Sequence, residues 1–170
     1  MLNPAGEKGE ALMSKYLTNL GYKCFSAPPK YHPQWDIQAV KPDGTKIHFE
    51  VKMDMIGMFL NARSGFNFYI ECFNTKQKKP SGIFYSRAEY YAYLFLTRQK
   101  DYVLYTMKTR SLRNFLCESD CKVVDNKKTG EHNAVGWLMS IHDLKSSGIH
   151  YRTEYFDSEG VCRNPRAGEL

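Results

Sequence analysis

No apolar run in the sequence approaches the length of about 18 residues that a membrane-spanning helix needs. The first residues, Met1 to Pro4, do not have the composition of a signal peptide. These absences predict a cytoplasmic protein with no membrane partner. A glycine-rich phosphate loop is also lacking, because Gly44, Gly57 and Gly65 stand alone, so no nucleotide cofactor is indicated. The absence of internal repeats and of low-complexity segments excludes a repeat architecture.

The spacing of the five cysteines matches neither a disulfide framework nor a common zinc module. The number of cysteines is odd, and no two of them form a C-x-x-C motif, so reduced thiols are expected. Zinc held by Cys117, Cys121 and a histidine such as His132 is an alternative, although that spacing is unusual. The cysteines are Cys24, Cys72, Cys117, Cys121 and Cys162.

Composition places the chain among globular proteins. It has 170 residues, of which 42% are hydrophobic and 25% are charged, and this size allows a full hydrophobic core. We expect one domain over residues 1–160 and a loose tail over residues 161–170. The formal net charge of +6 favours a polyanionic partner.

Hydrophobic periodicity predicts an α/β protein that begins with a helix over residues 7–20, ended by Gly21. A short strand follows over residues 22–25. Strands over residues 35–40 and 46–52 flank the turn sequence Lys-Pro-Asp-Gly-Thr and therefore predict an antiparallel hairpin.

The second half of the chain continues the alternation of strands and helices. The strand over residues 66–73 is expected to run beside the strand that carries Glu50. The strands over residues 90–96 and 102–107 predict a central hairpin buried on both faces. Thr109 is expected to cap a helix that reaches Leu116. An irregular region over residues 121–133 and a last strand with a short helix over residues 134–144 complete the expected elements.

Three charged residues are set into the apolar strands of the first hairpin. Asp36 lies near the start of one strand, and Glu50 and Lys52 lie near the end of the other. Antiparallel pairing brings these ends together, and the two-residue period of a strand turns Glu50 and Lys52 to one face. Carboxylate oxygens suit Mg²⁺, and a neighbouring lysine can orient a water and offset charge on a phosphate. The hairpin therefore predicts a site for metal-dependent phosphodiester cleavage.

The order of the motifs adds a family resemblance over about residues 6–116. It is carried by Gly6-x-x-x-Glu10 in the first helix, Trp35-Asp36-Ile37, Phe49-Glu50-Val51-Lys52 and Ser86-Arg87-Ala88-Glu89-Tyr90-Tyr91. In this order the chain resembles the PD-(D/E)xK nuclease superfamily, and within it archaeal Holliday-junction resolvases and small phage endonucleases. Trp35 stands where the superfamily commonly has a proline, which is not a metal ligand.

The resemblance implies a restriction-endonuclease-like mixed β-sheet flanked by helices. It also implies a catalytic set of Asp36, Glu50, Lys52 and Glu10. Mg²⁺, for which Mn²⁺ can substitute, would be held by Asp36, Glu50, Glu10 and the Val51 carbonyl. Lys52 would contact the attacking water and the scissile phosphate.

Further charged residues extend the expected site. Glu71 is either an additional acid of the metal shell or one partner of a salt bridge to a lysine. A basic loop is either a phosphate grip or a solvated surface, and its candidate residues are Lys76, Lys78, Lys79, Ser81 and Arg87. The tyrosines of the middle strands are interpreted as core. Phe59, Phe66 and Phe68 could touch unpaired bases.

The leading hypothesis is a Mg²⁺-dependent DNA endonuclease. Branched DNA in recombination or repair is one expected substrate, and a phage that acts in a host cell is one expected source. A symmetric homodimer would suit a resolvase, and the apolar middle strands could supply its interface or belong to the core. The alternatives are a nicking enzyme, an exonuclease, and a nucleic-acid-binding module of the same fold that has lost catalysis.

Overall fold

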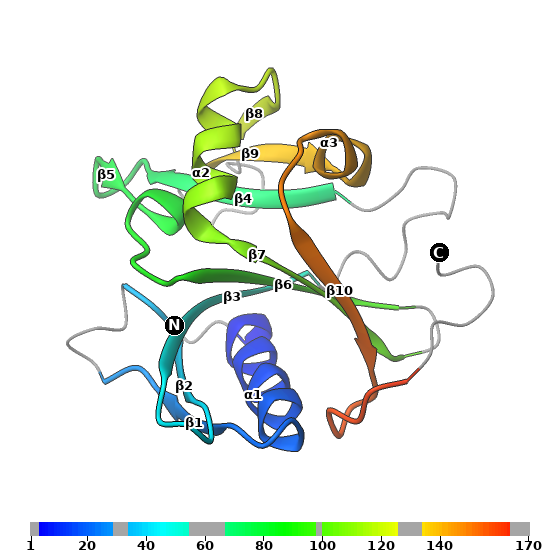
Figure 1. Cartoon of the computed structure of the whole chain (residues 1–170). Helices are drawn as coiled ribbons and strands as arrows, with labels where there is room; N and C mark the ends of the chain where they lie inside the picture. Colours follow the sequence, from blue (N-terminus) through cyan, green and yellow to red (C-terminus); the bar gives the residue numbers. More distant parts are fainter. Residues whose placement is uncertain (1–3, 29–33, 55–66, 98–99, 126–133, 164–170) are drawn as a thin grey trace.

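The computed structural model of the chain describes residues 4–28, 34–54, 67–97, 100–125 and 134–163. Within these ranges the strands form a six-stranded mixed sheet and a four-stranded antiparallel sheet, with helices on both sides (Figure 1). The α/β class expected from the sequence is therefore confirmed. No helix among the described residues is long and apolar enough to cross a bilayer.

The six-stranded sheet forms the middle layer. Its order is β1 (Lys23–Ser26), β2 (Ile37–Val40), β3 (Lys46–Asp54), β6 (Tyr90–Leu96), β7 (Tyr102–Lys108) and β10 (Tyr151–Phe156). The pair β3–β6 is parallel, and the other neighbouring pairs are antiparallel.

The four-stranded sheet covers one face of this middle layer, and α1 (Pro4–Asn19) covers the other (Figure 1). The strand order of this second sheet is β5 (Lys79–Pro80), β4 (Asn67–Asn74), β9 (Ala134–Ser140) and β8 (Lys122–Asp125). The shorter elements η2 (Gly82–Phe84), α2 (Thr109–Glu118) and α3 (Ile141–Ser146) lie on the same side as this second sheet. Between the sheets, the ring of Phe68 meets those of Tyr93, Phe95 and Tyr105 edge-on, at centroid distances of 5.1, 5.2 and 5.2 Å.

The alternation of side chains along the middle strands explains how one sheet serves two cores. Val51 and Leu94 belong to the core beneath α1, whereas Tyr91 and Tyr93 belong to the core beneath the second sheet. Helix α1 approaches β3 closely at Gly9, where an added Cβ would lie 2.9 Å from the Cβ of Met53. This close approach brings the next residue, Glu10, near the strand that carries Glu50.

The predicted hairpin is confirmed. Ile37 pairs with Phe49 and Val40 pairs with Lys46 across β2 and β3. The turn between them uses Gly44 at φ 86°, a left-handed conformation that glycine adopts without a steric cost.

The predicted position of β4 is wrong. β4 was expected beside β3, but β3 pairs with β2 and β6, and β4 pairs with β5 and β9 in the second sheet. The physical reason is that an apolar strand pattern specifies burial but not a neighbour. The hairpin of β6 and β7 is buried as expected, with residues 91–96 between 0% and 7% exposed, so these strands belong to the core and offer no dimer interface.

Three further expectations about the elements fail. Thr109 does not cap α2: it is the first helical residue, and Lys108 precedes it without a side-chain cap. Strand β8 lies in a region expected to be irregular, and β10 follows the strand that was expected to be the last. The end of the described chain is also held in place, because Arg163 Nη2 lies 2.8 Å from Asp101 Oδ2. The packed part therefore extends at least to Arg163, beyond the predicted start of the tail.

Candidate active site

Asp36 lies directly before β2 and is buried, with 7% of its surface exposed. Its backbone N–H donates to the carbonyl of Phe49 at 2.9 Å, although Phe49 already pairs with Ile37. Two consecutive residues thus meet one residue of β3, an arrangement like that of a β-bulge, which can re-aim a side chain. The carboxylate turns to β3, where its Oδ2 accepts a hydrogen bond from the Val51 N–H at 2.7 Å.

Glu50 and Lys52 lie on the face of β3 that is turned to the second sheet, because Val51 between them packs beneath α1. Lys52 Nζ lies 2.8 Å from Glu50 Oε1. Glu50 is 6% exposed, whereas the Lys52 side chain is 37% exposed. The acid is therefore buried, and the lysine lies between it and the surface.

Burial and the neighbouring charges weaken the acidity of Asp36. Burial of the carboxyl group, followed by the charge of Glu50, raises its pKa from 3.8 to about 6, while Lys52 and the Val51 N–H act in the opposite direction. The charge of Glu10 on α1 adds a smaller increase to this pKa. Carboxylates held this close are unfavourable unless a cation offsets their charge.

Lys52 is held in its protonated form. Burial favours the neutral amine, but the carboxylates of Glu50 and Asp36 outweigh it and raise the pKa of Lys52 above 10.5, with a further contribution from Glu71. At neutral pH this side chain is a cation and a hydrogen-bond donor.

Glu10 and Glu71 approach the cluster from elements outside the hairpin. Glu10 is half-buried on α1, and its charge reaches Asp36. Glu71 is half-buried on β4, and its charge raises the pKa values of Lys52 and Tyr91. Among the described residues Glu71 forms no ion pair within 4.0 Å, so the salt bridge considered for it is not observed there. Charges on α1 and on β4 thus act on a cluster that the hairpin holds.

The oxygen donors of this cluster suit a hard divalent cation. Within the described chain, no hydrogen bond reaches Oδ1 of Asp36 or Oε2 of Glu50. Mg²⁺ is commonly bound by one or two carboxylates while it keeps several water ligands. A group of three or more histidine, cysteine, aspartate or glutamate side chains close enough to enclose a metal ion is absent from the described residues. The structure thus fits an open site with two carboxylate ligands better than an all-protein cage.

Tyr91 is a site residue that the sequence did not reveal. It pairs with Glu50 across the parallel strands β3 and β6 and is 0% exposed. Its hydroxyl has no hydrogen-bond partner among the described residues. Burial, followed by the charge of Glu50, raises its pKa well above 10, so the hydroxyl keeps its proton. Its strand was interpreted as core, and only the pairing of β3 with β6 shows that Tyr91 neighbours the acids.

The basic loop residues are exposed, but one of the candidates faces inward. Lys76 and Lys78 are exposed on the connection from β4 to β5, Lys79 is exposed on β5, and Arg87 is exposed after η2. The backbone N–H of Arg87 donates to the carbonyl of Gln34 at 2.8 Å, which places Arg87 close to the start of β2. The Oγ of Ser81 is buried, so it faces the protein instead of the solvent.

Other candidates from the sequence are removed or fall outside the described residues. Phe68 is 0% exposed in the core, so the prediction that it could touch bases is wrong. Phe59 and Phe66 lie outside the described residues, as does His132 of the zinc alternative. All five cysteines are free thiols.

A groove of about 1030 Å³ lies elsewhere on the molecule, among α1, β7, α2 and β10. Its lining includes both basic and acidic residues, such as Lys108, Arg152 and Glu154, and excludes Asp36, Glu50 and Lys52. The two buried acids and the protonated Lys52 identify the hairpin cluster, and not this groove, as the candidate active site.

No protein-family model, no curated protein and no solved structure matches the chain. The chemistry of the site is therefore inferred from its own residues.

Proposed function

We propose that this protein is a metal-dependent deoxyribonuclease that hydrolyses phosphodiester bonds at the cluster of Asp36, Glu50 and Lys52. One observation carries the proposal: two buried carboxylates and a protonated lysine, 2.8 Å from one of them, share a site in which the pKa of Asp36 is raised to about 6. Buried acids whose charges repel each other cost stability, and a bound cation would offset that repulsion.

Asp36 and Glu50 would hold Mg²⁺ or Mn²⁺. Glu10 is close enough for its charge to raise the pKa of Asp36 and would add negative charge at the metal site. When bound, such a cation supplies Lewis acidity and lowers the pKa of a coordinated water. The Val51 N–H orients Asp36 through its 2.7 Å bond, so the two carboxylates are held by neighbouring parts of one hairpin.

Lys52 would act on the phosphate. Because the two acids keep it protonated, it is suited to donate hydrogen bonds to a phosphate oxygen and to offset developing negative charge. A protonated lysine is not a base, so its role would be electrostatic. Its partial exposure leaves it accessible to a substrate at the surface.

DNA is the proposed substrate because exposed cations lie on the elements next to the site. Arg87 is anchored at Gln34, two residues before Asp36, and Lys79 lies on β5 beside β4. The +6 net charge adds to this local attraction for a polyanion. Branched DNA, including four-way junctions, is the substrate class that the resemblance to resolvases suggests, and a homodimer would have to use a surface other than β6 and β7.

The test is a cleavage assay on supercoiled plasmid, linear duplex, single strands and a four-way junction, with Mg²⁺, Mn²⁺ or EDTA. We expect metal-dependent cutting by the natural chain. Asp36→Asn and Lys52→Met should each lower the rate by about 100-fold or more, because each removes a charge that stabilises the transition state.

Lys15→Met is the matched control. Lys15 forms an ion pair with Glu159 at 3.1 Å, and both side chains are largely exposed, so its loss should leave cleavage unchanged. Circular dichroism would establish that every variant is folded. Cutting that persists in EDTA, or that survives in both site variants, would contradict the proposed site. Tight DNA binding without cutting of any substrate would favour a binding module that has lost catalysis.

A further inference from the structure

An unusual concentration of exposed aromatic side chains lies beside the candidate active site. Tyr85 is 44% exposed, Phe84 is 41% exposed and Phe73 on the neighbouring strand is 37% exposed. We propose that Phe84 and Tyr85 form a stacking surface for unpaired bases of the DNA substrate. This inference rests on the proposed function, because it takes DNA as the ligand.

The backbone that carries these two rings is held firmly. Gly82 has φ 50° and packs so closely on β4 that an added Cβ would lie 2.3 Å from the carbonyl oxygen of Glu71. Ile83 is 0% exposed in the core between the sheets. The guanidinium of Arg113 on α2 donates to the carbonyl of Ile83 at 2.8 and 3.0 Å and to that of Ser86 at 2.8 Å. The segment is thus preorganised, and Phe84 and Tyr85 remain accessible.

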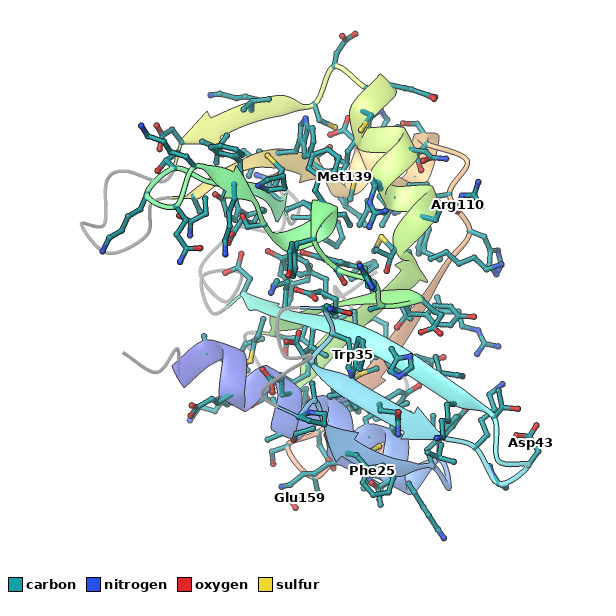
Figure 2. All side chains as sticks on the ribbon, turned by 90° about the vertical axis from the view of Figure 1, so that its left-hand side faces the viewer. Phe25, Trp35, Asp43, Arg110, Met139 and Glu159 are labelled. Atoms are coloured by element: carbon teal, nitrogen blue, oxygen red, sulfur yellow. The ribbon has the colours of Figure 1, made fainter. Side chains whose placement is uncertain are left out.

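Hydrogen bonds connect the same segment to the start of β2. The Ser86 hydroxyl donates to the Gln34 carbonyl at 3.2 Å, and the Arg87 N–H donates to the same carbonyl at 2.8 Å. Gln34 is followed by Trp35 and the site residue Asp36. Figure 2 shows Trp35 where the chain enters β2, at the opposite end of the hairpin from Asp43 in the turn. The aromatic segment therefore lies at the end of the hairpin that holds the acids.

The charge of the chain segment that carries the rings favours nucleic acid over a protein partner. From Thr75 to Ala88 the sequence contains four basic residues and no acidic residue. The basic residues are exposed, and they are Lys76, Lys78, Lys79 and Arg87. Exposed aromatic rings among cations are typical of surfaces that bind single strands, where bases stack on rings and the backbone meets positive charge.

Bases inside a duplex are already stacked on each other and cannot lie on a protein ring. A surface of this kind would therefore select DNA that presents unpaired nucleotides next to the bond that is cut, as single strands, flaps and branch points do. The ring of Phe84 packs at a tilt against Trp137 on β9, at a centroid distance of 5.5 Å, and Phe84 remains 41% exposed.

The experiment measures binding in EDTA, so that no cleavage takes place, by fluorescence anisotropy of a labelled oligothymidylate and of a blunt duplex. Tyr85→Ala and Phe84→Ala should each weaken binding of the single strand by about tenfold, as expected for the loss of one stacking ring. Binding of the blunt duplex should remain within about twofold. Tyr85→Phe keeps the ring and should bind like the natural chain.

Phe25→Ala is the matched control, because Phe25 is 53% exposed on the edge strand β1, which β2 separates from β3. This variant should leave both affinities unchanged. Equal losses on single strand and duplex, or no loss on either, would overturn the stacking surface, as would a natural chain that binds no nucleic acid.

Cleavage with Mn²⁺ separates this inference from the proposed function. If the natural chain binds single strands through Tyr85 but cuts no DNA, the nuclease proposal fails and the stacking surface stands. If the natural chain cuts DNA, and Tyr85→Ala binds single strands and cuts DNA as the natural chain does, the stacking surface fails and the nuclease proposal stands.

Discussion

At the scale of single residues, Asp36 is the acid of the candidate site whose pKa is raised by its surroundings. Its carboxyl group is buried, it lies near the charge of Glu50, and its compensating contacts are the Val51 N–H and the charge of Lys52. In the folded, metal-free protein this acid binds its proton more tightly than in the unfolded chain. The difference makes stability depend on pH.

The pH dependence has a definite sign. Because the folded pKa of about 6 exceeds the unfolded value of 3.8, the folded state binds more protons between these values. The free energy of unfolding should therefore fall as pH rises from about 4 to about 6, by roughly 3 kcal/mol for this group. Asp36→Asn should remove that fall, as measured by urea unfolding in EDTA. The control Asp120→Asn alters an exposed acid after α2 and should keep the fall in the free energy of unfolding. An unchanged pH dependence in Asp36→Asn would contradict the assignment of this fall to Asp36.

Two tyrosines on β6 allow a paired test of the buried hydroxyl groups. The Tyr91 hydroxyl has no hydrogen-bond partner among the described residues, whereas the Tyr93 hydroxyl accepts a hydrogen bond from the Tyr69 N–H at 3.1 Å. In metal-free protein, Tyr91→Phe should raise the free energy of unfolding by about 1 kcal/mol, and Tyr93→Phe should lower it by about the same amount. Chemical denaturation measures both. A loss of stability in Tyr91→Phe would mean that water or another group satisfies this hydroxyl in solution.

At the scale of elements, the contact of η2 with β4 depends on Gly82. A side chain at this position would clash with the Glu71 backbone in addition to adopting φ 50°. Gly82→Ala should therefore cost about 3 kcal/mol or more in the free energy of unfolding.

The hairpin turn provides the control for Gly82. Gly44 also has a positive φ, 86°, but no atom lies within 4 Å of an added Cβ. Gly44→Ala should cost only about 1 kcal/mol, which reflects the backbone conformation alone. Thermal unfolding of both variants would decide the matter, and similar melting temperatures would show that η2 can move away from β4.

At the scale of the whole molecule, a bound cation should stabilise the fold by mass action. Mg²⁺ or Mn²⁺ at 100 times its dissociation constant should raise the free energy of unfolding by about 2.7 kcal/mol. Asp36→Asn should lose most of this gain, whereas Lys15→Met, remote from the site in an exposed ion pair, should retain it. Thermal melting with and without metal tests the prediction, and an equal metal effect in both variants would place the ion elsewhere.

The residues of the candidate site differ in how far the sequence predicts their positions. Asp36, Glu50 and Lys52 were brought together correctly because they belong to one hairpin, whose turn and alternation are encoded within residues 35–52. Glu71 was expected near the acids, and its charge does reach Lys52, yet it arrives from the second sheet and not from a strand beside β3. Tyr91 was assigned to the core, which is where it lies, but its position opposite Glu50 depends on a parallel pairing over 41 residues of sequence.

The sequence by itself determined the hairpin and the three charged residues at its open end, because a tight turn and a two-residue period are local properties of the chain. Only the tertiary structure shows which strands are neighbours, because an apolar strand can be buried equally well in either sheet. Long-range packing brought Glu71 and Tyr91 close to the acids and joined the segment after Tyr85 to Gln34, two residues before Asp36. These residues come from separate elements, and only long-range packing brings them to one end of the hairpin.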